Sequence, residues 1–215
     1  MPEISKVVTD EFTMEYFKFG TGKKNLVILP GLSIQSVMGS ANAVASEYKI
    51  FQDDFTVYVF DRRQNLPSEY SIYDMARDTG TAISKIGLDK VSIFGASQGG
   101  MIAMVMAIEY PELVEKLVLG STSSHMKEEQ SAVLDKWLEL AKNKDAHKLY
   151  DSFAKEIYPA EIYSEYEEFF AEQSMSVTSA ELERFYILAS AIKGFDISPD
   201  LKKIKCPTLA IGVYE

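Results

Sequence analysis

The feature that most constrains this chain is a five-residue turn between two apolar segments. The turn, Gly95-Ala96-Ser97-Gln98-Gly99, follows a β-branched segment at 90–94 and precedes a longer apolar segment at 100–108. These lengths and residue types predict a buried strand followed by a buried helix. So sharp a turn brings both of its glycines against neighbouring backbone, where a Cβ would collide. We therefore expect the Ser97 hydroxyl to stand clear of the sheet, above the positive end of a helix.

The rest of the N-terminal half alternates predicted strands with predicted helices. Extended segments are expected at 6–19, 25–29, 55–60 and 114–120. Between them, Ser71 and Asp74 have the spacing of a capping box, which starts a helix that runs to about Ile86, with Gly87 suited to end it. Strands that alternate with helices predict an α/β fold with a mostly parallel, doubly wound sheet. Such sheets carry their sites beyond the carboxyl ends of the strands, where Gly31, Asp61, Ser97 and Ser121 all fall.

A glycine-lysine turn at Gly20–Lys24 raises the question of a phosphate-binding loop. It lacks the spacing of that motif, and it precedes a strand rather than a helix. We therefore predict a hairpin turn at this position.

The strand-like residue pattern ends after residue 121 and is replaced by a helical pattern. Helical stretches rich in charged, alanine, leucine and aromatic residues are expected at 127–143, 146–157, 160–173 and 179–193. A strand-like pattern of apolar residues returns at 206–213. We predict a core at 1–121, a helical cap over the strand ends at 122–200, and a core strand that resumes at 201–215.

Composition excludes several classes of function. The net charge is −10, and no run of Lys or Arg exceeds two residues, so nucleic acid and anionic membranes are poor partners. The one cysteine, Cys206, excludes an intramolecular disulfide. We see no leader pattern and no apolar run near the ~20 residues that span a bilayer. We expect a cytoplasmic location. No metal-ligand spacing or dinucleotide fingerprint is present, so no metal and no cofactor is expected.

Taken together, these features resemble the α/β-hydrolase superfamily, in its capped branch. The turn at Ser97 matches the nucleophile elbow of that family. The segments that carry the resemblance are Leu29-Pro30-Gly31-Leu32, Val59-Phe60-Asp61-Arg62-Arg63, Phe94–Gly100, Tyr110-Pro111-Glu112-Leu113-Val114 and Cys206–Ile211.

The resemblance implies roles for individual residues. Ser97 would be the nucleophile, and the backbone N–H groups of Gln98 and Leu32 would form the oxyanion hole. Gly31, Gly95 and Gly99 would shape the turns. Pro30 stands where the family usually has a histidine that is not the catalytic base, while the adjacent glycine is kept as Gly31.

The chain departs from the family pattern at its C-terminal end. The family's triad acid would fall just past Glu215, and its histidine after one further strand, so we expect the fold to be C-terminally incomplete. Glu215 itself is a doubtful acid because terminal residues fray. Only two histidines are present. His147 is expected to be a solvated surface residue, and His125 is the sole candidate for a substitute base. A serine without a base is a poor nucleophile, so we expect impaired activity.

Three readings of function follow. The first is a serine hydrolase that acts on a small carboxylic ester, or on a related acyl or C–C substrate. The second is a non-catalytic hydrolase-fold protein that binds a small ligand, and the third is a fragment completed by another chain. If a further strand is missing, 208–213 becomes an exposed apolar edge, which predicts a homo-oligomer or strand exchange.

The cap contributes candidate residues for a pocket over Ser97. Met126, Met175 and the aromatic side chains could line it, although we expect most of these aromatics to hold the cap helices together. The aromatic residues are Trp137, Phe153, Tyr158, Tyr163, Tyr166, Phe169, Phe170, Phe185 and Tyr186.

Overall fold

A seven-stranded sheet forms the centre of the protein in the computed structural model, which describes residues 2–212. The strand order is β1-β2-β4-β3-β5-β6-β7. Strands β1 and β2 run antiparallel to their neighbours, and the pairs from β4 to β7 are parallel. The predicted α/β fold with a mostly parallel sheet is confirmed. The strands are β1 (Ile4–Val8), β2 (Thr13–Phe19), β3 (Lys24–Leu29), β4 (Phe55–Arg63), β5 (Val91–Ala96), β6 (Val114–Gly120) and β7 (Thr208–Ile211).

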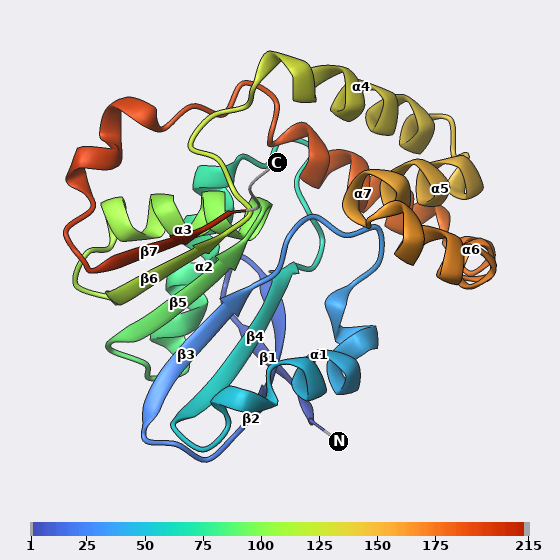
Figure 1. The fold of residues 1–215 in the computed structure, drawn as a ribbon. Helices are drawn as coiled ribbons and strands as arrows, with labels where there is room; N and C mark the ends of the chain where they lie inside the picture. Colours follow the sequence, from blue (N-terminus) through green and yellow to red (C-terminus); the bar gives the residue numbers. More distant parts are fainter. Residues whose placement is uncertain (1, 213–215) are drawn as a thin grey trace.

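Helices cover both faces of the sheet (Figure 1). Side chains alternate between the faces along β3, because successive residues of a strand point to opposite sides. Val27 and Leu29 pack in one core with α2 (Ile72–Lys85) and α3 (Gln98–Glu109). Leu26 and Ile28 pack in a second core with α1 (Ala41–Glu47). The doubly wound arrangement is therefore confirmed.

The start and end of α2 are where the sequence predicted them. The Ser71 side chain accepts a hydrogen bond from the backbone N–H of Asp74, and the Asp74 carboxylate accepts one from the Ser71 N–H. Gly87, with φ 81°, follows the C-cap residue Ile86. The left-handed conformation at Gly87 suits glycine.

The hairpin predicted at Gly20–Lys24 is wrong. Strand β2 pairs with β4 rather than β3, and β3 lies between β4 and β5. The turn packs instead against the segment that precedes β4, where the Thr21 N–H donates to the Gln52 carbonyl at 2.9 Å. A glycine-rich turn fixes a local change of direction, but it does not determine which strand becomes the neighbour.

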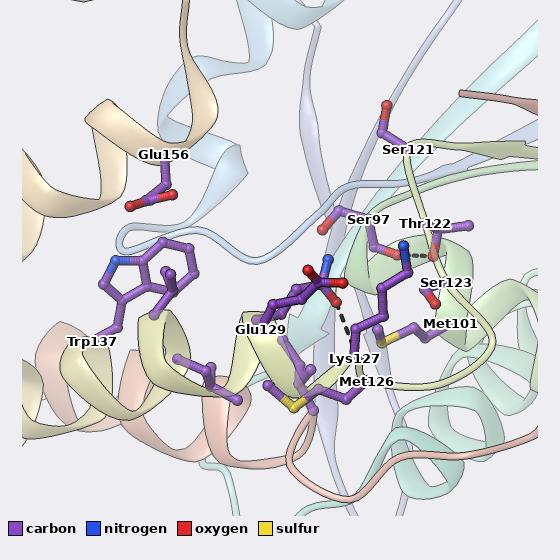
Figure 2. Close-up of a pocket in the computed structure, with 14 residues that line it drawn as sticks. Ser97, Met101, Ser121, Thr122, Ser123, Met126, Lys127, Glu129, Trp137 and Glu156 are labelled. Atoms are coloured by element: carbon purple, nitrogen blue, oxygen red, sulfur yellow. Dashed lines mark hydrogen bonds between the residues drawn. The ribbon is translucent and has the colours of Figure 1, made fainter. Parts of the chain in front are cut away.

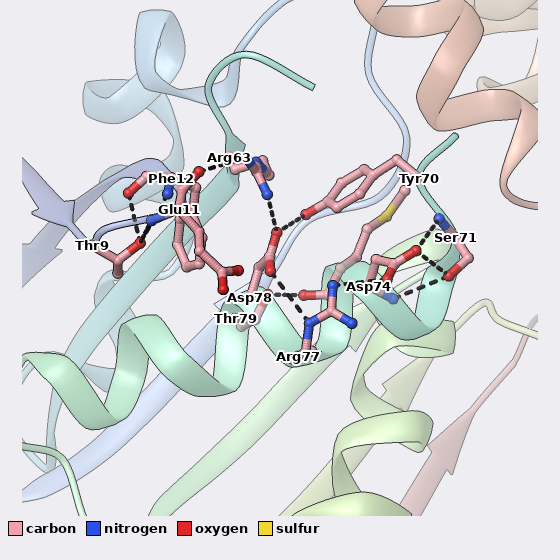
Figure 3. Close-up of polar contacts among 11 residues, drawn as sticks. Thr9, Glu11, Phe12, Arg63, Tyr70, Ser71, Asp74, Arg77, Asp78 and Thr79 are labelled. Atoms are coloured by element: carbon pink, nitrogen blue, oxygen red, sulfur yellow. Dashed lines mark hydrogen bonds and ion pairs between the residues drawn. The ribbon is translucent and has the colours of Figure 1, made fainter. Parts of the chain in front are cut away.

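A buried polar cluster joins β4 to α2 (Figure 3). Asp78 is only 1% exposed. Its carboxylate accepts a hydrogen bond from the Tyr70 hydroxyl at 3.0 Å and forms an ion pair with Arg63 Nη1 at 3.4 Å. Arg63 also donates to the Glu11 carbonyl, and its guanidinium lies over the Phe12 ring. Burial, followed by the negative charge of Asp78, raises the pKa of Tyr70. The cluster fixes the β1–β2 loop and α2 against one edge of β4.

Four helices lie above the carboxyl ends of the strands (Figure 1). They bury a separate apolar core that includes Leu134, Leu149, Leu182 and Phe185. The helices occupy the predicted insertion, whereas the domain division at residues 121 and 200 stays a prediction. They are α4 (Glu128–Lys142), α5 (Ala146–Ile157), α6 (Ala160–Met175) and α7 (Ser179–Ser190).

Strand β7 stands at the end of the strand order and pairs with β6. All four of its residues are exposed, including Leu209 at 56% and Ile211 at 53%. The exposed apolar edge predicted at 208–213 is confirmed for Thr208–Ile211, while Val213 lies outside the described residues.

Candidate functional site

Ser97 occupies the strained turn between β5 and α3. Its backbone has φ 49° and ψ −120°, in a region that residues with a Cβ seldom adopt. A Cβ added at Gly95 would lie 2.5 Å from the Gly99 carbonyl oxygen, and one at Gly99 would overlap the Leu29 carbonyl. The predicted reason for both glycines is therefore confirmed. The turn leaves Ser97 exposed at the N-terminus of α3.

Hydrogen bonds fix the backbone of this turn. The Ser97 N–H donates to the Gly120 carbonyl at the end of β6, at 2.9 Å. The Thr122 hydroxyl donates to the Ser97 carbonyl at 2.6 Å. Neighbouring strand β6 and the segment after it therefore support the strained conformation from outside the turn.

The loop after β3 lies directly beside Ser97. Leu29 is paired with Gly95, so the two strand ends are level. A Cβ added at Gly31 would lie 3.2 Å from the Ser97 Cβ and 3.8 Å from its Oγ. Sheet register therefore brings Gly31 close to the Ser97 side chain, while the oxyanion site of Leu32 and Gln98 stays a prediction.

The first residue of α3 is anchored by its side chain as well. Gln98 is fully buried, and its Nε2 donates to the Leu188 carbonyl in α7 at 2.6 Å. Its Oε1 accepts a hydrogen bond from Arg62 Nη2 at 3.1 Å, and the same nitrogen donates to the Pro30 carbonyl at 2.7 Å. Burial lowers the pKa of Arg62 to about 10, against the opposing charge of Asp61. The guanidinium remains a cation at neutral pH.

Asp61 joins the same region to α7. Its carboxylate pairs with Arg184 Nη2 at 2.5 Å and accepts a hydrogen bond from the Ser36 hydroxyl, also at 2.5 Å. It also accepts the Arg62 backbone N–H at 2.7 Å. Sequence reasoning placed Asp61 at the carboxyl edge but assigned no role to Arg62 or Arg184. The spacing of charged residues carried no signal for these contacts, which join residues 32 to 123 positions apart in the sequence.

A cavity of about 580 Å³ opens over Ser97. Figure 2 shows Ser97 and Thr122 on one side of it and Trp137 and Glu156 on the other. Met101 and Met126 add apolar surface. Further lining residues are Ser121, Ser123, Lys127, Glu129, Gln130, Val133, Leu134 and Ile192. The cavity therefore combines apolar walls with several polar groups.

Most of the aromatic residues predicted as pocket candidates lie elsewhere. Trp137 alone among them lines the cavity at Ser97. Phe185 is buried in the core of the four helices, and Met175 is 80% exposed. A second cavity of about 350 Å³ is lined by the Pro30–Val37 loop, including Gly31 and Leu32, which do not line the first. Its aromatic lining is Tyr150, Phe153, Tyr158, Phe169 and Phe170.

Neither histidine lines the cavity at Ser97. His125 is exposed, and its Nδ1 lies 3.2 Å from the Ser198 hydroxyl. His147 is exposed on α5, as predicted, with Nδ1 3.2 Å from the Ser174 hydroxyl. Glu215 lies outside the described residues. Within residues 2–212 no cluster of His, Cys, Asp and Glu could hold a metal ion, and no helix has the length and apolar character to cross a membrane.

Comparison with known proteins agrees with this geometry. A family model described as the alpha/beta hydrolase fold matches residues 24–158. RutD of Rhizobium rhizogenes, named as a candidate carbamate hydrolase, is 25% identical over 200 residues, which are 89% of this chain and 74% of the relative. The mouse serine hydrolase BPHL is 25% identical over 167 residues, which cover 70% of this chain and 56% of the relative.

Solved structures share the fold at lower sequence identity. MGS-M2, an alpha/beta hydrolase from a deep-sea metagenome library, superposes with a TM-score of 0.83 at 21% identity, over 96% of this chain and 78% of its own. The enol-lactonase of Burkholderia xenovorans superposes with a TM-score of 0.81 at 18% identity, over 97% and 80%. The sharp turn at Ser97 and the level ends of β3 and β5 agree with this match. The family model and the named relatives show that this chain belongs to the alpha/beta hydrolase fold family and is a hydrolase.

Proposed function

We propose that this protein is a serine hydrolase that attacks the carbonyl group of a small ester or a related acyl or C–C substrate. Ser97 is the nucleophile, and the backbone N–H groups of Leu32 and Gln98 stabilise the oxyanion. The observation that carries the proposal is the exposed, strained Ser97 with Gly31 beside its hydroxyl. Strain of this kind is kept where the surroundings enforce it, which is common at active sites.

The chemistry follows from this arrangement. The Ser97 oxygen forms a bond to the substrate carbonyl carbon, and the carbonyl π electrons move onto its oxygen. Fixed N–H donors there stabilise the transition state more than the substrate. Ser97 loses its hydroxyl proton in this step; collapse then breaks the bond from the carbonyl carbon to the leaving group, which departs with that proton and leaves an acyl-enzyme. Water cleaves the acyl-enzyme, releases the carboxylic acid and restores the Ser97 hydroxyl. The N-terminus of α3 adds its partial positive charge close to the developing anion.

The cavity bounds the substrate. A volume of about 580 Å³ with Met101, Met126 and Trp137 on its walls suits a small molecule with an apolar portion. The relatives named for carbamate and lactone hydrolysis act on compounds whose reactive group is also an acyl carbonyl. They support the choice of reaction class, and they do not select among ester, carbamate and lactone.

The position of the histidines favours a second candidate function. Serine needs an adjacent base, yet His125 is held by Ser198 and His147 lies on α5, away from the cavity. A small-ligand-binding protein of hydrolase fold, or a fragment completed by another chain, would retain the elbow without a base in this chain. In either case we expect only residual catalysis by the oxyanion site, since triad enzymes keep some rate without the base.

Intact mass spectrometry after incubation with a fluorophosphonate tests the proposal. We expect one adduct on the parent, none on Ser97→Ala, and one on Ser123→Ala, which removes a second hydroxyl from the same cavity. No adduct on folded parent protein would reject an activated serine in this chain and favour ligand binding. An adduct that persists in Ser97→Ala would place the nucleophile elsewhere.

A further inference from the structure

We infer that Arg62 is a positioning residue that holds the Pro30–Leu32 loop and Gln98 at a fixed separation around Ser97. Hydrogen bonds and an ion pair couple this arrangement to the position of α7. This inference rests on the proposed function, because it concerns the two backbone donors assigned there. Arg62 itself does not line the cavity, so it acts through the groups that it bonds.

Arg62 joins two hydrogen-bond acceptors that lie next to Ser97. Its Nη2 donates both to the Pro30 carbonyl at 2.7 Å and to the Gln98 side chain at 3.1 Å. Pro30 belongs to the loop that carries one proposed oxyanion donor, and Gln98 carries the other. One nitrogen atom therefore links the two halves of the proposed oxyanion hole, which follow two different strands: the loop after β3 and the start of α3 after β5.

Placing the Arg62 cation at this buried position costs free energy of folding. Arg62 is only 5% exposed, and its Nε is buried without a hydrogen-bond partner in residues 2–212. A buried cation with an unpaired donor destabilises a fold unless other contacts compensate. Its nearest compensating charge is Asp61, whose carboxylate is shared with Arg184. Arg63 Nε is likewise buried without a partner in residues 2–212, so what sets Arg62 apart is that both acceptors of its Nη2 lie next to Ser97, in the loop after β3 and at the start of α3.

The same cluster of side chains is connected to α7. Gln98 Nε2 donates to the Leu188 carbonyl, and Arg184, one turn earlier on α7, pairs with Asp61. Asp61 also binds the Ser36 hydroxyl, further along the loop after β3. Two contacts therefore hold α7 against the loop after β3 and the turn at Ser97. They are the ion pair of Arg184 with Asp61 and the hydrogen bond from Gln98 to the Leu188 carbonyl. Movement of α7 would shift both proposed donors relative to Ser97.

The neighbouring residue Arg63 provides a matched control. It is also an arginine of β4, with a side chain 16% exposed, one hydrogen bond to a backbone carbonyl and one carboxylate partner. Figure 3 shows its contacts with Glu11 and Asp78, and neither of these residues lines the cavity at Ser97. Lysine keeps the charge at either position but cannot reproduce the planar fork of arginine. Arg62→Lys and Arg63→Lys therefore perturb the fold similarly, while only the first touches the proposed donors.

Two readouts test the inference. In hydrolysis of p-nitrophenyl acetate, we expect Arg62→Lys to lower kcat by about 10- to 100-fold with KM nearly unchanged, because misplaced donors weaken the transition state more than the bound substrate. Arg63→Lys is expected to keep kcat within about 3-fold, because the contacts of Arg63 do not include either proposed donor. Equal kcat values for the two variants, or a change confined to KM, would overturn the positioning role.

The second readout is amide hydrogen exchange in the Leu32–Ser36 segment and at the start of α3, which needs no activity. Exchange there is expected to rise in Arg62→Lys and to match the parent in Arg63→Lys. Unchanged exchange in Arg62→Lys would overturn the inference. Absence of fluorophosphonate labelling in the parent, together with the expected exchange pattern, would instead reject the proposed function and leave the structural role of Arg62 standing.

Discussion

The ion pair between Arg184 and Asp61 allows a quantitative prediction about how the four helices are held on the sheet. The side chains are 18% and 9% exposed, and Nη2 lies 2.5 Å from the carboxylate. Replacing one member of a buried pair costs about 3–5 kcal/mol, because the partner remains buried and uncompensated. In Arg184→Met the carboxylate keeps two hydrogen bonds, from Ser36 and the Arg62 N–H. We therefore expect the lower end, about 3 kcal/mol.

The assay is urea unfolding of the parent and of Arg184→Met, with heat unfolding as a second measure. For a chain of this size, about 3 kcal/mol corresponds to a fall in Tm of roughly 6–12 °C. The control is Lys193→Met, which removes the cation of an ion pair whose members are 59% and 52% exposed. Exposed pairs contribute at most about 1 kcal/mol. The m-value must stay constant for the two free energies to be compared.

A double-mutant cycle isolates the contribution of the pair. The Asp61→Asn change alone is expected to be costly as well, and the two changes together should cost less than their sum by about 2 kcal/mol. The reasoning would be refuted if Arg184→Met lost no more stability than Lys193→Met. It would also be refuted if the two single changes were strictly additive.

Three further predictions follow from separate features. Gly99→Ala forces a Cβ onto the backbone at the end of β3, so we expect insoluble protein or loss of fluorophosphonate labelling; normal labelling would contradict the steric argument. Burial pushes the pKa of Asp74 upward, but hydrogen bonds from Ser71 and Arg77 outweigh it and set the pKa below its ordinary 3.8. The stabilisation by Asp74 is therefore present above pH 3.8 and lost as the pH falls further. Asp74→Asn is expected to lower the free energy of unfolding by about 1 kcal/mol at neutral pH, and the resulting Tm difference from the parent should narrow below pH 4. A constant gap would exclude this linkage. Finally, we propose that the β7 edge pairs between chains: light scattering should show the parent mass rising with concentration and Leu209→Lys remaining monomeric, whereas equal masses would reject the pairing.

Much of the fold could be predicted from the sequence because its signals are local. The capping box at Ser71 and Asp74 depends on residues three apart, and the glycines at 95 and 99 are demanded by one turn. The four helices after residue 121 were also recognisable from composition over a dozen residues each. Each of these features is decided by short-range sterics and hydrogen bonding.

The features that were missed depend on pairing across the chain. The glycine-lysine turn after β2 was compatible with a hairpin, but β2 pairs with β4, whose sequence lies beyond α1. The contacts of Arg62 and Arg184 likewise join β4, the loop after β3 and α7. Ser97 could be found from its turn, whereas the groups that hold its surroundings could be found only once the segments were folded together.

Leu29 pairs with Gly95, so the backbone around Ser97 is part of the central sheet, whereas the walls of the cavity come from the helices above it. Both residues belong to the interior of the sheet, where opening of the backbone requires global unfolding, so the spacing around Ser97 is protected from local fluctuation. The walls of the cavity come largely from α4 and the segment before it, on a layer with its own core. Substitutions in that layer can change which molecules fit while leaving the strand ends undisturbed. In evolutionary terms, we expect new substrate preferences in this lineage to arise through the helices while the elbow stays constant.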